Sequence, residues 1–198
     1  MNDSILQMDD LLDDKKLDYQ IALQCAPLLT GIKVSNLLIV PHSKQRAVTA
    51  RFQKTALSCC PLCVTDEKAT FLLYHKEKLL QYLEDDASRE ILRLTGYLSY
   101  DLEEILRELS ARYCDYIKYR QVFPHEIGVF LGYPVEDVLG FINNQGRNYL
   151  YIGYWKVYGN LTEAMHLFEK YRQAKQLVIR MISQGVNVHH IIESSYSA

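Results

Sequence analysis

The sequence predicts an α+β protein, in which a small, mainly antiparallel sheet is packed by helices and the C-terminal half is predominantly helical. Short apolar runs bounded by turn residues, such as SNLLIVP at 35–41, are typical of strands and fall in the first half. Apolar residues recur at helical spacing through the second half. The 198 residues are 48% hydrophobic and 23% charged, so a core can form without disulfides or metals.

The chain is expected to form a single α+β domain over residues 15–198, with the sheet in residues 15–85 and the helical half in 86–198. Residues 1–14 are rich in aspartate and predict a loose acidic tail or a frayed helix. The N-terminal sequence is too acidic for a signal peptide, and no apolar run approaches the roughly 20 residues that span a bilayer. We therefore expect a cytoplasmic protein whose five cysteines are thiols.

Helices and strands alternate in the first half. An apolar stripe of helical spacing starts at Leu17 and is closed by Pro27 and Gly31. The further elements expected here are a strand at 35–41, a basic helix within 43–57, two strands within 61–75 joined by a polar turn at 66–68, and a helix at 76–83.

In the second half, a short helix at 88–94 is broken at Gly96, and Ser99 is the expected cap of the next helix, whose first turn is acidic. The last helix begins after Asn160, with Glu163 placed as in a capping box, and ends before Gly185. Between these helices, an aromatic strand is expected near 148–158, where it can join the sheet.

Residues 125–142 match the spacing of a helix-turn-helix, with Val138 and Phe141 as the buried anchors of its second arm. That arm carries Glu136 and Asp137 and offers no side chain suited to reading guanine. The segment contains three acids and no lysine or arginine, so phosphate contacts cannot drive binding through it. A helix-turn-helix DNA-binding regulator is kept as an alternative that this acidic second helix argues against.

Cys60 and Cys63 have the spacing of a redox or zinc pair, but the segment is expected to enter a strand and not a helix. Structural thiols are favoured, and a metal site at Cys60 and Cys63, with Cys59 nearby, is a weaker alternative. His189 and His190 near the C-terminus are expected on a solvated tail. No phosphate-binding glycine loop and no hydrolase or metalloprotease motif occurs in the sequence.

The aromatic segment NYLYIGYWKVYG at 148–159 is the best remaining candidate for a site. In a strand, Gly153 would let a planar ligand or another backbone approach closely, and Lys156 with Arg147 could hold an anionic group. The alternative is a central strand whose aromatic residues lie at the margin of the core. The candidate ligand- or partner-binding residues are His125, Glu126, Tyr133, Arg147, Asn148, Tyr154, Trp155 and Lys156.

Three segments carry a resemblance to a known family: CAPLLTGIKVSNLL, FPHEIGVFLGYPVEDVLGFI and NYLYIGYWKVYGN. Together they resemble an uncharacterised clostridial (Firmicutes) family, a domain of unknown function, across nearly the whole chain. The resemblance implies a cytoplasmic protein and a link to redox or iron metabolism, with a flavodoxin-like partner. It supplies no catalytic residues, and the cysteine-rich segment at 58–63 lies outside it.

These observations favour a non-catalytic binding or accessory protein with an aromatic groove for a protein or small-molecule partner. The main alternative is a redox accessory protein or enzyme that binds flavin or haem. The sequence leaves open whether the protein catalyses a reaction, and the interpretation without catalysis is favoured. It requires no cofactor, and it argues against a membrane or nucleic-acid partner.

Overall fold

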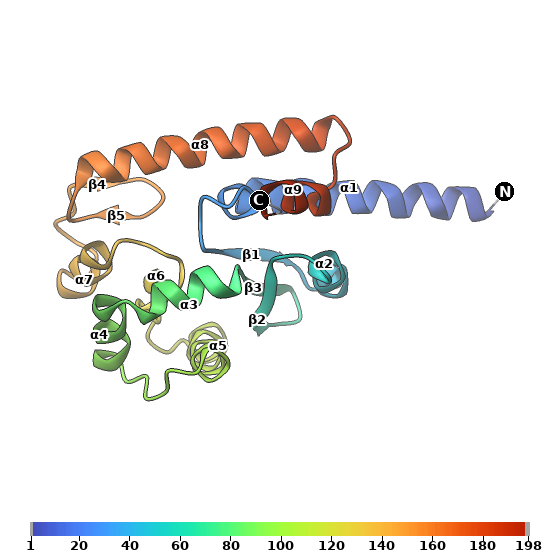
Figure 1. Cartoon of the computed structure of the whole chain (residues 1–198). Helices are drawn as coiled ribbons and strands as arrows, with labels where there is room; N and C mark the ends of the chain where they lie inside the picture. The colour runs from blue at the N-terminus through green and yellow to red at the C-terminus, as the bar shows by residue number, and fades with distance from the viewer. Residues whose placement is uncertain (1, 197–198) are drawn as a thin grey trace.

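The computed structural model describes the backbone of residues 2–196 and the side chains of residues 13–196. It has the expected α+β architecture, with a small antiparallel sheet and a helical second half (Figure 1). Its elements in chain order are α1 Asn2–Leu29, β1 Ser35–Pro41, η1 His42–Lys44, α2 Gln45–Phe52, β2 Ser58–Val64, β3 Lys68–Tyr74, α3 Lys76–Glu84, α4 Asp86–Leu94, α5 Leu102–Tyr119, α6 Ile127–Phe130, α7 Val135–Asn143, β4 Tyr151–Ile152, β5 Lys156–Val157, α8 Leu161–Ser183 and α9 Val188–Tyr196.

The main sheet has three antiparallel strands in the order β1-β3-β2. The central strand β3 pairs with β1 from Ser35 opposite Tyr74 to Pro41 opposite Lys68. Proline occurs in this sheet on the two outer strands, β1 and β2, where the missing N–H does not interrupt a central ladder. The pairing of β2 with β3 shifts register at Leu62, which creates a bulge.

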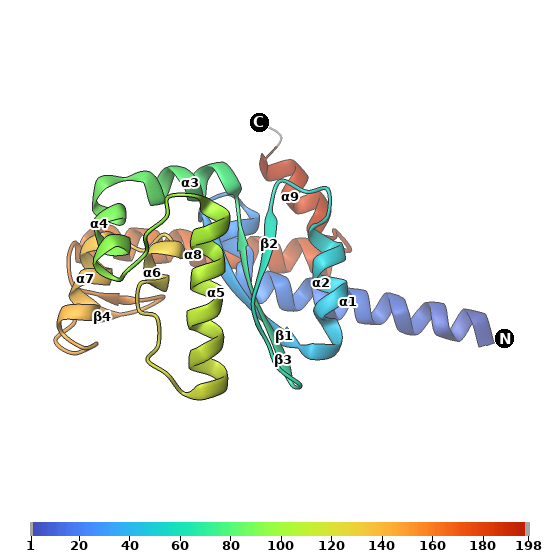
Figure 2. The same cartoon turned by 90° about the horizontal axis from the view of Figure 1, so that it is seen from below.

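Helices cover both faces of this sheet, and each side has its own core. On one side, alternate residues of β3, such as Phe71 and Leu73, pack with α1, α2, α8 and α9. On the other side, Leu72 packs with α3 to α7. In Figure 1, α1 and α9 lie between the sheet and α8, while α3 and α5 lie beyond the opposite face; Figure 2 shows the same order from below. A third, smaller core joins the start of α8 to β4 and β5.

Several helix ends and strands confirm the expectations drawn from sequence. The strand at 35–41 is β1, and the two strands around the polar turn are β2 and β3. At the start of α8, the Asn160 side chain accepts a hydrogen bond of 3.1 Å from the Glu163 N–H, and Gly185 follows the helix with a φ of +90°. None of the described helices is both long enough and apolar enough to cross a bilayer.

The structure corrects the expected cap of α5. Asp101, not Ser99, caps this helix, because its Oδ1 accepts the N–H groups of Glu103 and Glu104 at 3.0 Å each. Ser99 lies two residues before Asp101, and its hydroxyl oxygen accepts a hydrogen bond from the Asp101 N–H.

The N-terminal segment, for which a loose acidic tail or a frayed helix was expected, is helical, and so is the segment expected to be a C-terminal tail. Helix α1 begins at Asn2 and includes the residues assigned to an acidic tail, and its N-terminal part extends away from the other elements (Figure 1). The solvated tail expected around His189 and His190 is helix α9, whose Val188 and Ile192 are buried in the core on the α1 side of the sheet.

The expected strand at 148–158 is wrong. The segment forms the short hairpin β4-β5, which is a sheet of its own and does not join β1-β3-β2. The reason lies in the reversal at Gly153 and Trp155, where the Gly153 N–H donates to the Trp155 carbonyl at 3.0 Å. A Cβ on Gly153 would lie 2.3 Å from the Phe168 ring, so only glycine permits this close packing on α8.

Because β3 supports both cores, replacing Leu72 by alanine should lower the free energy of unfolding by about 2–5 kcal/mol. Leu72 is fully buried, whereas Leu98 is 95% exposed, so Leu98→Ala is a control with the same chemical change and an expected effect within about 0.5 kcal/mol. Urea denaturation of the two variants measures both values. Equal destabilisation by the two substitutions would contradict the assignment of β3 as the centre of the fold.

Candidate functional site: an aromatic cavity

A cavity of about 360 Å³ lies where β1, the α6–α7 segment and the β4-β5 hairpin meet. Its wall is mainly apolar and aromatic, and its polar members are His125, Asp137 and Lys156. The apolar and aromatic residues that line it are Leu37, Phe123, Ile127, Gly128, Leu131, Tyr133, Val138, Phe141, Ile152, Gly153, Tyr154 and Trp155.

The carboxylate of Asp137 joins α7 to the hairpin. Asp137 is buried in the first turn of α7, where the helix dipole favours an anion. Its Oδ2 accepts a hydrogen bond of 2.6 Å from Trp155 Nε1, and its Oδ1 accepts the N–H groups of Tyr158 and Gly159 at 2.6 and 2.8 Å. Three donors therefore compensate the cost of burying this charge, and they fix the orientation of the indole in the cavity wall.

Tyr133 forms a stacked part of the wall. Its ring stacks on Trp155 with a centroid distance of 4.9 Å and an interplanar angle of 26°. The Lys33 ammonium lies 4.9 Å from the centroid of the same ring. The Tyr82 hydroxyl donates to the Tyr133 carbonyl at 2.5 Å, so the turn that carries Tyr133 is also attached to α3.

Lys33 is a buried amine, 7% exposed, whose Nζ donates to Asn36 Oδ1 at 3.0 Å. Among the described residues no carboxylate forms an ion pair with it. Burial lowers the pKa of Lys33 to about 8. The hydrogen bond to Asn36 and a cation–π contact with the Tyr133 ring compensate part of the cost of burying its charge.

The hairpin side of the cavity is supported by α8. Phe168 packs edge-on against Trp155 at 4.5 Å, and the Tyr154 ring lies 5.5 Å from Phe168 and 5.2 Å from Tyr171. The Phe168 ring fills the space beside Gly153. The close contact that we expected a ligand to make at this glycine is therefore made by a side chain of the protein. The wall is therefore held by ring contacts before any ligand binds.

His125 and Lys156 bring polar groups to the cavity. The His125 ring lies between Phe123 and Phe141, at centroid distances of 5.4 and 4.9 Å. Lys156 Nζ donates to the Gly146 carbonyl at 2.7 Å and lies 5.5 Å from the Phe141 centroid. No carboxylate of the described residues pairs with Lys156, and its ammonium retains donors for another acceptor.

Five of the eight candidate residues line this cavity together: His125, Tyr133, Tyr154, Trp155 and Lys156. The other three lie elsewhere. Glu126 is buried and accepts hydrogen bonds from Tyr97 and Arg112 at 3.2 and 3.1 Å. Arg147 and Asn148 are exposed and are not part of the wall.

The role of Asp137 was missed by sequence reasoning, which used this residue only as an argument against DNA binding. A usable signal was present, because an acid in a mainly apolar helix needs a partner if it is buried, and the single tryptophan is an N–H donor. Lys33 was also missed as part of the site. Leu37 and Lys33 come from a distant part of the chain, and only the fold brings them to Tyr133.

The helix-turn-helix geometry is partly present. Gly132 has a φ of +67° at the turn, and Val138 is buried as expected for an anchor of the second arm. Helix α6 has only four residues. In α7, Asp137 faces Trp155 and Phe141 faces the cavity, so these parts of the arm are engaged within the protein and not presented to a nucleic acid.

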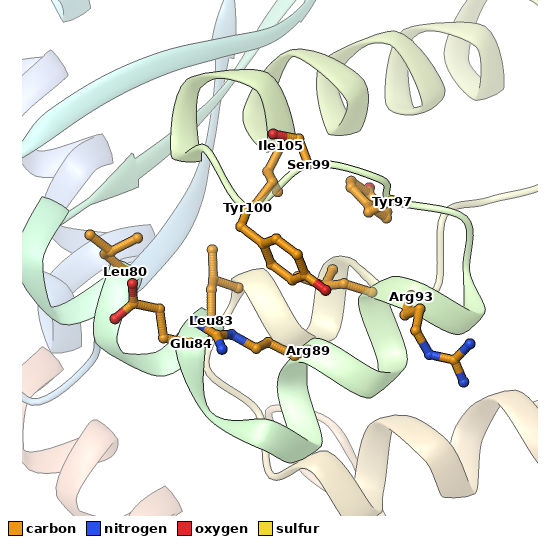
Figure 3. A pocket seen from close by; sticks show the side chains of 10 residues that line it. Leu80, Leu83, Glu84, Arg89, Arg93, Tyr97, Ser99, Tyr100 and Ile105 are labelled. Carbon is orange, nitrogen blue, oxygen red and sulfur yellow. The ribbon is translucent and has the colours of Figure 1, made fainter.

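A second hollow, shown in Figure 3, lies between α3, α4 and the loop before α5. The Tyr100 ring lies across it, and the Arg89 guanidinium is 5.3 Å from the centroid of that ring. Its volume is about 20 Å³, which is close to the space that a single water requires. Its size therefore argues against a ligand site.

Among the described residues, histidine and carboxylate side chains that could bind a metal ion lie close together at one place. His189, His190 and Glu193 on α9 place their ligand atoms within 4.8 Å of one another. Both imidazoles already contact the Glu193 carboxylate, at 3.3 and 3.5 Å. The weaker metal candidates Cys60 and Cys63 are not part of such a group within the described chain.

A family model described as "Protein of unknown function (DUF3793)" matches residues 21–192. This range includes every residue of the cavity wall. It agrees with the resemblance to an uncharacterised family of unknown function. No curated protein and no solved structure matches the chain.

Replacing Asp137 by asparagine should lower the free energy of unfolding by about 1–3 kcal/mol, because an amide nitrogen would then face N–H donors. Trp155 is the only tryptophan in the sequence, so its emission wavelength should also change as the indole loses its charged acceptor. Urea denaturation followed by fluorescence measures both effects. Asp115→Asn, at an exposed position of α5, is the matched control, and equal effects of the two variants would contradict the role of Asp137.

Lys33 should make stability depend on pH. Its pKa is about 8 in the folded protein against 10.5 ordinarily, so the unfolded state holds one more proton between these values and stability rises with pH there. Below pH 8, Lys33 is charged in both the folded and the unfolded state, and the cost of burying its charge is fully present. Above pH 10.5, Lys33 is neutral in both states and this cost is absent.

Relative to Lys33→Met, wild type should therefore gain up to ~3 kcal/mol between pH 8 and 10.5. Denaturant midpoints measured at both pH limits test this. Burial raises the pKa values of neighbouring Tyr133 and Cys25 to about 12, so in the folded protein these groups stay protonated through the window. Their titration in the unfolded state is common to both proteins and cancels in the comparison. Parallel pH profiles for the two proteins would show that Lys33 is not buried as a cation.

Proposed function

We propose that this chain, which belongs to the DUF3793 family of proteins of unknown function, is a non-catalytic binding protein that holds a small, planar, anionic aromatic molecule in its aromatic cavity. The observation that carries the proposal is the coincidence of Tyr133, Tyr154, Trp155 and Lys156 on one cavity wall. We further propose that the protein works in the cytoplasm, where its five thiols would stay reduced.

The size and lining of the cavity support a small-molecule ligand. A volume of about 360 Å³ lies within the range of roughly 300–1,000 Å³ that ligand pockets have. Flat aromatic walls favour a planar partner, because offset stacking and edge-to-face contacts both need a ring on the ligand. Tyr133 and Trp155 are already held by Lys33 and Asp137, so binding would require little ordering of the wall.

The charges of the site support an anionic substituent. Among the described residues, Asp137 is the only carboxylate that lines the cavity, and its oxygens already accept three hydrogen bonds within the protein. Lys156 has no ion-pair partner among the described residues and can donate to a carboxylate or phosphate. Of the two cofactors considered from sequence, flavin mononucleotide combines a planar ring system with a phosphate, and a bound flavin would supply the link to redox metabolism.

The expected result is that planar anionic aromatics quench the emission of Trp155. Because this is the sole tryptophan, the full-length protein reports directly on the cavity. The probes are flavin mononucleotide, 1-anilinonaphthalene-8-sulfonate and the uncharged naphthalene. Lys156→Gln should weaken binding of the two anions about tenfold, which corresponds to the loss of one charge-assisted hydrogen bond, and should leave naphthalene unaffected.

Lys170→Gln on the exposed face of α8 is the matched control, because it removes the same charge away from the cavity. Lys170→Gln should leave the affinities for the two anions and for naphthalene unchanged. Saturable quenching that survives both substitutions equally would show that the anion is not held by Lys156. Absence of saturable quenching by any of the three probes would contradict the proposal as a whole.

A further inference from the structure

Two cysteines that are 51 positions apart in the sequence meet between the sheet and α5. The Sγ atoms of Cys63 on β2 and Cys114 on α5 are 2.7 Å apart, which is closer than two unbonded sulfur atoms normally remain. Cys63 is buried and Cys114 is half-buried. The pair that the sequence singled out, Cys60 and Cys63, is not the pair that the fold brings together.

The bulge in β2 explains why Cys63 faces α5. In a regular strand, neighbouring residues such as Leu62 and Cys63 point to opposite faces of the sheet. The register shift between Pro61 and Cys63 inserts an extra residue, so Leu62 and Cys63 both join the core on the α5 side.

Helix α5 presents a matching stripe at a spacing of four residues, formed by Ser110, Cys114 and Lys118. The Ser110 hydroxyl lies 3.0 and 2.9 Å from the carbonyl oxygens of Pro61 and Leu62 and can donate to either. This contact holds the helix against the bulge, one turn before Cys114. One turn after it, the pKa of Lys118 is raised, first by the charge of the Cys114 thiolate beside it.

We propose that Cys63 and Cys114 form a redox-active dithiol that is oxidised to an intramolecular disulfide by small-molecule disulfides such as oxidised glutathione. The site is separate from the aromatic cavity and does not depend on its ligand. Because the two sulfur atoms are already adjacent, the bond forms with little movement of the backbone.

The reaction is a thiol–disulfide exchange in two steps. The Cys114 thiolate attacks one sulfur of the oxidant, the S–S bond of the oxidant breaks, and one thiolate leaves with the electron pair. Cys63 then loses its proton to solvent and attacks the Cys114 sulfur, which releases the second thiolate. The protein loses two electrons and two protons, and the oxidant becomes two thiols.

The order of attack follows from the surroundings of the two sulfurs. Burial, together with the hydrogen bond to Cys114, raises the pKa of Cys63 to about 11, so Cys63 reacts second. Cys114 is half-buried and therefore the more accessible of the two residues, and it interacts with the Lys118 ammonium one turn away. A hollow of about 550 Å³, lined by Cys63, Lys68 and Tyr113 among others, lies on the Cys63 side of the pair, and Cys114 is not part of its wall.

The remaining cysteines are in different surroundings. Cys25 is fully buried, and burial raises the pKa of Cys25 and of Cys59 to about 12 and raises that of Cys60. Cys60 makes its contact with the Pro61 carbonyl and not with another sulfur. Selective oxidation should therefore occur at Cys63 and Cys114.

The test uses the full-length reduced protein in buffers with a stepped ratio of reduced to oxidised glutathione. Remaining thiols are alkylated, and the digest is analysed by mass spectrometry. The expected product is a single cross-linked peptide pair joining Cys63 to Cys114, lighter by two hydrogen atoms and reversed by dithiothreitol. A different pairing, or no cross-link at any ratio, would overturn the proposal without relying on a variant.

Variants then distinguish the sulfur that attacks the oxidant from the sulfur that closes the disulfide. Cys63→Ser should trap glutathione on Cys114, whereas Cys114→Ser should abolish the cross-link and leave Cys63 free of glutathione. Cys60→Ser is the matched control and should give the wild-type cross-link. Lys118→Met should slow oxidation severalfold at neutral pH and leave the identity of the product unchanged. Glutathione trapped equally on Cys63 and Cys114 would contradict the assigned order of attack.

Discussion

The structure depends on one short strand that is apolar on both faces. Strand β3 is paired on both edges, by β1 and β2, and its alternate side chains enter two separate cores. A strand in this position has no face left for solvent, so helices must cover it on both sides. The N-terminal and C-terminal helices supply one cover and α3 to α7 supply the other, which is why segments from both ends of the chain pack side by side.

The two sides of the sheet differ in their chemistry. The side formed by α1, α2, α8 and α9 is a packed apolar layer, and the Gln20 and Gln24 side chains of α1 hydrogen-bond the backbone of Ile39 at its edge. The opposite side contains both the aromatic cavity and the thiol pair. Both features arise where regular structure is interrupted, at the hairpin β4-β5 and at the bulge in β2. Such interruptions redirect side chains that a regular strand would place on the other face.

Burying the Asp137 carboxylate is costly unless its acceptors are filled, and the hairpin supplies the necessary donors. The same hydrogen bonds turn Trp155 into the cavity and hold it against Tyr133. A structural requirement, the satisfaction of one buried charge, thereby shapes the surface that we propose binds a ligand. Lys33 also contacts the Tyr133 ring, and this cation–π contact and the Asn36 hydrogen bond stabilise an ammonium that has no ion-pair partner among the described residues.

The sequence by itself determined the features that depend on local pattern. Apolar period and turn residues located β1, β2, β3 and α8, because strand and helix faces repeat at two and 3.6 residues, and the Asn160 cap required only residues within one turn. Five of the fifteen residues that line the cavity were among the candidates drawn from the sequence. The expected strand at 148–158 failed because packing of Phe168 onto Gly153 reverses the chain, and a contact between segments leaves no local pattern.

Only the tertiary structure decided which distant residues became neighbours. The bond from Trp155 to Asp137, the ring of Tyr133 against Lys33, and the approach of Cys114 to Cys63 join segments separated by 18 to 100 positions in the chain. The physical reason is that burial selects partners by volume, charge and hydrogen-bonding need across the whole core. Sequence spacing carries no information about that selection.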